Sequence, residues 1–164
     1  MAQIRSTRLE HDLLGDREVP NEALYGVHTL RALENFPISG IAISQYGGLV
    51  RALAEIKLAA VQTNAELGLI DPKRTKAIAA ACAEIIDGKH HEHFVVDVIQ
   101  GSAGTSSNMN ANEVIANRAL EILGSEGATI TVFILTSTST SVRAPTTCIR
   151  LPSSLRCSST STNC

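Results

Sequence analysis

Apolar residues recur at helical spacing between residues 48 and 67, and Gly68 then provides a stop signal. The residues expected on one side of this helix are Leu49, Leu53, Ile56, Ala60 and Asn64. We therefore predict a long helix here, with these residues on one face.

Two further helices follow from clear boundary signals. Asp71 followed by Pro72 is an N-cap with proline at the first helical position, and Asp87-Gly88 ends the pattern that contains Ile78, Cys82 and Ile85. A third main helix is predicted from near Ser106 to Gly124.

The segment before these helices is polar, is interrupted by Gly15, Pro20 and Gly26, and predicts a short helix at residues 27–35. Residues 95–99 are rich in valine, but a lone strand has no partner, so we expect them to be extended within a helical domain. The fold class expected is mainly α.

The composition changes abruptly after Gly124. Residues 125–164 contain 18 serines and threonines, and no Asp or Glu follows Glu126. We divide the chain into a helical domain at residues 1–124 and an irregular or disordered tail at residues 125–164.

Charge and hydropathy exclude several classes of protein. The net charge of −2 predicts no basic face for nucleic acid or for an anionic membrane, and no apolar run is long enough to span a bilayer. The N-terminus carries charges and lacks the apolar core of a signal peptide, so a cytoplasmic protein is expected. We interpret Cys82 as a small buried apolar residue.

The richest candidate chemistry lies in residues 100–113, Gln-Gly-Ser-Ala-Gly-Thr-Ser-Ser-Asn-Met-Asn-Ala-Asn-Glu. Backbone N–H groups at a helix start attract anions, and short hydroxyl and amide side chains around it can orient a carboxylate. An ordinary polar loop that ends in a helix cap explains the same composition equally well.

Two other groups invite an interpretation. Residues 89–93, Lys-His-His-Glu-His, contain potential metal ligands, but neighbouring residues rarely converge on one ion without a turn, so we expect a polar loop and no metal. Glu113 is either a buried partner for the asparagines or a first-turn carboxylate favoured by the helix dipole, and we prefer the second interpretation.

Three ordered blocks carry a family resemblance. They are residues 10–20 (Glu-His-Asp-Leu-Leu-Gly-Asp-Arg-Glu-Val-Pro), 25–36 (Tyr-Gly-Val-His-Thr-Leu-Arg-Ala-Leu-Glu-Asn-Phe) and 97–118. Together they resemble the aspartase/fumarase superfamily, and its aspartate ammonia-lyase branch most closely. Class II fumarases have Trp-Gly-Ala-Gln-Thr-Gln-Arg where this chain has Tyr-Gly-Val-His-Thr-Leu-Arg.

The resemblance implies a homotetramer of long helices, with no cofactor, that reversibly eliminates ammonia from L-aspartate to give fumarate. It implies that Thr105, Ser106 and Asn108 bind substrate. Asn110, Arg17 and Arg31 are the supporting candidates. The catalytic base of the family lies beyond the segments matched here, so no residue of this chain is expected to be catalytic.

A second substrate-binding block of the family, His-Pro-Asn-Glu-His-Val-Asn and then Gln-Ser-Thr-Asn-Asp, is missing from the visible sequence. The genetic code permits codons for residues 143–147 that encode Ser-Thr-Asn-Asp when they are read in the frame that starts at the third base of the first codon. In the same shifted frame, permitted codons for residues 148–152 continue as Val-Tyr-Pro-Thr-Ala. Residues 133–136 similarly permit His-Pro-Asn. We hypothesise a frameshift near Glu126-Gly127.

On this hypothesis the chain is the N-terminal domain of the fold, truncated before the central helical bundle. It is then expected to be inactive alone and not to form the family tetramer. The alternatives are a class II fumarase or related lyase, and a non-enzymatic helical module with a genuine disordered tail. Activity on aspartate and on malate, together with the coding DNA, would distinguish the three.

Overall fold

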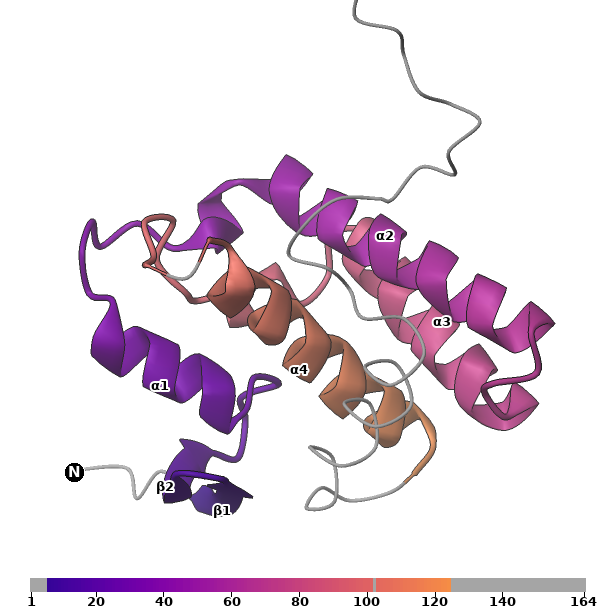
Figure 1. The fold of residues 1–164 in the computed structure, drawn as a ribbon, viewed down its shortest axis with the longest axis horizontal. Coiled ribbons are helices and arrows are strands. Elements are labelled where there is room, and N and C mark those ends of the chain that lie inside the picture. The colour runs from indigo at the N-terminus through magenta and orange to yellow at the C-terminus, as the bar shows by residue number, and fades with distance from the viewer. Residues whose placement is uncertain (1–5, 102, 125–164) are drawn as a thin grey trace, which may run out of the picture.

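The computed structural model describes residues 6–101 and 103–124, which form a hairpin followed by packed helices (Figure 1). The expected tail at residues 125–164, with its frameshift, lies outside the described residues. The elements in chain order are β1 (Thr7–Asp12), β2 (Gly15–Pro20), α1 (Val27–Asn35), η1 (Ile43–Gln45), α2 (Gly47–Glu66), α3 (Pro72–Ile86), η2 (His91–His93) and α4 (Thr105–Ile122).

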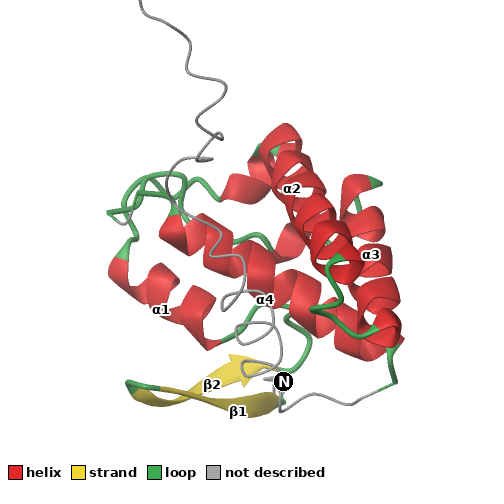
Figure 2. Cartoon of the chain, turned by 45° about the vertical axis from the view of Figure 1, so that its right-hand side comes forward, coloured by secondary structure: helices red, strands yellow, loops and turns green. Residues whose placement is uncertain are grey.

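The N-terminal segment forms an antiparallel hairpin, β1–β2, which the sequence did not predict (Figure 2). Thr7 pairs with Pro20 and Asp12 pairs with Gly15, so Leu13 and Leu14 form the turn. Gly15 has φ +109, a value that side chains disfavour. Among the apolar residues of the two strands, Val19 is fully buried, whereas Leu9 is exposed. The strands therefore show little of the apolar–polar alternation that would predict them from the sequence.

Helix α2 has the predicted extent, and its buried face lies beside the apolar face identified in the sequence. Val50, Ala54 and Val61 are buried, whereas Leu49 is 46% and Ile56 is 63% exposed. The two faces lie side by side on the helix and both contain apolar residues, so periodicity alone does not show which one is buried. Asn64 is also buried.

Helix α3 confirms the boundary signals in the sequence. The carboxylate of Asp71 accepts hydrogen bonds from the backbone N–H groups of Lys73 and Arg74, and Pro72 is the first helical residue. Ile78, Cys82 and Ile85 face the core against α2 and α4 as expected. Burial raises the pKa of the Cys82 thiol to about 12, which keeps it protonated at neutral pH.

Residues 95–99 run beside residues 41–43, but bends at Val96, Val98 and Ile99 interrupt the extended conformation expected from the sequence. Asp97 forms an isolated bridge with Ala42, and the backbone N–H of Ile43 donates to the carbonyl of Val96 at 2.9 Å. The Asp97 carboxylate accepts from Ser39 and from the N–H groups of Gly40 and Ile99, which hold its pKa well below the usual range. This segment leads directly into α4.

The described helices include none that is long and apolar enough to cross a membrane.

Candidate functional site

The site predicted from the sequence lies at the start of α4. Gly104 caps this helix in the left-handed conformation with φ +85, and Thr105 follows as the first helical residue. Thr105 is exposed, Ser106 is buried and Asn108 is half-buried. Thr105 therefore presents its hydroxyl on an accessible surface at the helix start, where the helix dipole favours an anion.

Gln100 fixes this helix start, a role that the sequence did not reveal. Its side-chain Nε2 donates to the carbonyl of Asp97 at 3.0 Å and to Ser107 Oγ at 2.7 Å, while its Oε1 accepts from the backbone N–H of Ser107 at 3.0 Å. The loop between the extended segment and α4 is thus closed by one amide side chain. The signal available in the sequence was only a polar residue next to glycine.

Asn110 lies one turn further along α4 and is fully buried. Its Oδ1 accepts from the backbone N–H of Val95 at 3.1 Å and its Nδ2 donates to the carbonyl of His93 at 3.0 Å. Both ends of the amide are engaged within the fold. Asn110 supports α4 by joining it to residues 93–95, and its full burial keeps it away from a ligand on the surface.

Arg31 holds the hairpin against α1. Its guanidinium makes two hydrogen bonds of 2.7 Å to the Asp12 carboxylate and one of 3.0 Å to the carbonyl of Gly15. Arg17 is exposed and lies 3.7 Å from Glu34. The recorded contacts of both arginines stay on the hairpin and α1, so within the described residues neither reaches the first turn of α4.

The Asp12–Arg31 pair gives a pH-dependent contribution to stability. Hydrogen bonding from Arg31 lowers the pKa of Asp12 from 3.8 to about 2. A carboxyl group whose pKa is lower in the folded than in the unfolded chain stabilises the fold at any pH above the unfolded-state pKa. This contribution is lost as the pH falls through the folded-state pKa.

We therefore expect Asp12→Asn to lower the thermal midpoint at pH 7, with the deficit shrinking between about pH 4 and pH 2. Circular dichroism melts across this range measure it. Asp16→Asn, which changes an exposed carboxylate on the same hairpin, is the control. A deficit that stays constant down to pH 2 would contradict the ion-pair account.

Glu113 lies in the middle of α4, so our preferred interpretation as a first-turn carboxylate of its own helix is wrong. Its carboxylate instead accepts from the backbone N–H groups of Gly26 at 2.9 Å, His28 at 2.9 Å and Thr29 at 3.0 Å. It therefore satisfies the positive end of α1. Glu113 does interact with the positive end of a helix, but that helix is α1 and not its own helix α4.

Glu10 completes the same cap by accepting from the N–H of Val27 at 2.8 Å. A Cβ atom on Gly26 would lie 2.6 Å from Glu10 Oε2 and 2.9 Å from Glu113 Oε1. A side chain at Gly26 would therefore displace the two carboxylates that cap α1.

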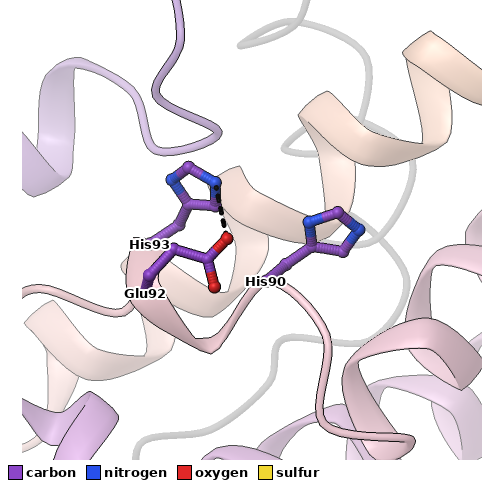
Figure 3. A group of neighbouring side chains, drawn as sticks. All are labelled: His90, Glu92 and His93. Carbon is purple, nitrogen blue, oxygen red and sulfur yellow. Dashed lines mark ion pairs between the residues drawn. The ribbon is translucent and has the colours of Figure 1, made fainter.

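The histidine cluster is folded back by the turn that a metal site would need. His90 has φ +63, and the Glu92 carboxylate lies between the rings of His90 and His93 (Figure 3). One ligand atom from each residue lies within 4.8 Å of the others.

The hydrogen bonds of these histidines do not suit a metal. His90 Nε2 pairs with Glu84 at 3.2 Å, but His93 Nδ1 faces the backbone N–H of Leu24 at 3.4 Å. A histidine that binds a metal through one ring nitrogen normally donates a hydrogen bond from the other. The Nδ1 atom of His93 instead faces the N–H donor of Leu24, so it has to accept. The expectation of a polar loop without a metal stays a prediction that this geometry favours.

Comparison with known proteins identifies the family. A model of a family described as lyases matches residues 15–149, well over half of the chain. The chain belongs to the aspartase/fumarase lyase family. It is 56% identical over 124 residues to an aspartate ammonia-lyase of Pseudomonas aeruginosa, covering 76% of this chain and 26% of the relative. It is 57% identical over 119 residues to a class II fumarate hydratase of Halobacterium salinarum, covering 73% and 25%.

Solved structures of lyases confirm the mainly α fold. A "fumarate lyase:delta crystallin" of Brucella melitensis bound to cobalt is 52% identical and superposes with a TM-score of 0.78, covering 82% of this chain and 29% of that one. A class II fumarase of Schistosoma mansoni is 36% identical with a TM-score of 0.72, covering 82% and 28%. The chain thus spans about a quarter of the length of the curated relatives that it matches.

Proposed function

We propose that the first turn of α4 binds a carboxylate of L-aspartate in the reversible elimination of ammonia that yields fumarate. The observation that carries this proposal is the exposed helix start at Thr105, whose hydroxyl lies beside the positive end of the helix. Ser106 lines the same turn. Asn108 adds an amide one turn along.

The chemistry explains why donors are needed there. Removal of the proton next to the β-carboxylate places a second negative charge on that group, and hydrogen-bond donors stabilise the resulting dianion. Neutral hydroxyl and amide groups do this without titrating near neutral pH. The described residues supply a binding segment, and we propose that the base comes from a part of the full-length enzyme outside this chain.

Aspartate is favoured over malate by residues 25–31, whose Tyr-Gly-Val-His-Thr-Leu-Arg departs from the fumarase pattern. Class II fumarate hydratase remains the second candidate because a relative of that name is as similar as the aspartate ammonia-lyases. Assays with both substrates separate the two.

The frameshift hypothesis gains support from a longer codon reading. Residues 133–140 with the codons TTC ATC CTA ACG AGC ACG TCA ACN, read from the third base, give His-Pro-Asn-Glu-His-Val-Asn in full. If the codon of Val142 is GTC and that of Arg143 is AGA, the shifted reading of residues 143–147 begins one residue earlier and gives Gln-Ser-Thr-Asn-Asp. The visible residue sets the second and third bases of each shifted codon, except where Ser, Leu or Arg allows two codon families, so this agreement supports a single lost base near Glu126-Gly127.

The coding DNA and a frame-restored gene test these proposals together. We expect CTA at Leu135, and we expect that inserting one base near codon 126 gives a longer homotetramer that forms fumarate from L-aspartate. Ultraviolet absorbance follows fumarate, and light scattering gives the oligomer size. The unmodified chain serves as the inactive control.

Two results would overturn parts of this account. A CTG codon at Leu135 would encode Asp in the shifted frame and contradict the frameshift. Activity with malate but none with aspartate would transfer the assignment to a fumarate hydratase.

A further inference from the structure

Lys57 reaches from α2 to the candidate site on α4. Its Nζ donates to Asn108 Oδ1 at 2.6 Å, a contact between residues 51 positions apart in the sequence. Lys57 is half-buried in a helix whose neighbouring positions, Ile56 and Glu55, are exposed. The side chain thus places its ammonium against the first turn of α4, away from the exposed side of α2.

This position is costly for a charged amine. Burial lowers the pKa of Lys57, and among the described residues no carboxylate lies within ion-pairing distance of its Nζ. The one other titratable group that influences it is Cys82, whose raised pKa keeps the thiol neutral. The described part of the chain therefore leaves one positive charge beside Asn108 without an anionic partner.

The contact also fixes the orientation of the Asn108 amide. An ammonium only donates, so the atom facing Lys57 is the amide oxygen, and the NH2 group points elsewhere. Exchanging the two ends would bring donors together at 2.6 Å. Asn108 is consequently set to act as a donor, which is the role that a carboxylate ligand requires.

We propose that Lys57 is a positioning residue of the carboxylate site: it orients the Asn108 amide so that the NH2 group can face the ligand. This inference rests on the proposed function of the first turn of α4. It adds a residue that lies outside the three sequence blocks that carry the family resemblance.

Kinetics of the frame-restored enzyme test the inference. We expect Lys57→Met to raise KM for L-aspartate about tenfold, because an oriented charge-assisted contact is lost, while Lys57→Arg recovers part of this loss. Lys76→Met, which removes an exposed lysine of α3, is the matched control and should leave KM unchanged.

A double-mutant cycle separates positioning from a general structural effect. If Lys57 acts through Asn108, Lys57→Met should change KM less than twofold in an Asn108→Ala background. Equal effects in both backgrounds, or a KM equal to that of Lys76→Met, would overturn the inference. A frame-restored parent without lyase activity would instead reject the proposed function.

Nuclear magnetic resonance of the 164-residue chain tests the contact independently of activity. Lys57→Met should shift the side-chain NH2 resonances of Asn108, which Asn108→Asp identifies by their loss, whereas Lys76→Met should not shift them. Unchanged Asn108 resonances in Lys57→Met would overturn the inference even if the parent enzyme is inactive.

Discussion

Replacing Glu113 with alanine is expected to lower the free energy of unfolding by about 3 kcal/mol. The substitution removes the acceptor for the N–H groups of Gly26, His28 and Thr29 at the start of α1. These groups lie where α4 covers α1, so water replaces the carboxylate poorly. Urea denaturation followed by circular dichroism measures the loss.

Glu113→Gln should cost less than alanine, because the amide oxygen still accepts while the charge at the helix end is lost. Glu55→Ala on the exposed side of α2 is the control and should change stability by less than about 0.5 kcal/mol. Equal midpoints for the Glu113 and Glu55 variants would show that the cap contributes nothing.

Replacing Thr105 with valine in the frame-restored enzyme is expected to lower kcat/KM for L-aspartate by about 100-fold. Valine keeps the shape of threonine but removes the exposed hydroxyl at the start of α4. A donor that strengthens its bond as charge develops affects kcat as well as KM. Steady-state rates at several aspartate concentrations separate the two constants.

Thr63→Val is the matched control, because Thr63 is an exposed threonine on α2 whose hydroxyl donates within its own helix to the carbonyl of Ala59. Its kcat/KM should equal that of the parent. If Thr105→Val also retained parental kcat/KM, Thr105 would be a helix-start residue without a substrate contact, and the binding proposal would fail for it.

Local signals predicted the helices well. Asp71-Pro72 located the start of α3, and the short helix at residues 27–35 was predicted with the bounds of α1. These boundaries depend on residues within a few positions of each other. The hairpin was missed because its strands bury little apolar surface, and the buried side of α2 depends on where α3 and α4 pack.

The candidate site was predicted as a segment but not as an arrangement. The family-like run pointed to Thr105, and the structure places it at an accessible helix start. The sequence did not reveal the structural contacts of Gln100, Lys57 and Glu113, because each of these side chains bonds to a residue on another element or loop. Short polar side chains show no periodicity that would reveal such partners in advance.

The cap on α1 also sets an order for assembly on the ribosome. The N–H group of Gly26 and its acceptor on Glu113 are 87 positions apart, so α1 is synthesised long before its cap. The hairpin and α1 must therefore wait for α4 before their junction closes. Because Glu113 precedes the proposed frameshift near Glu126-Gly127, every partner of this junction is translated before the reading frame changes.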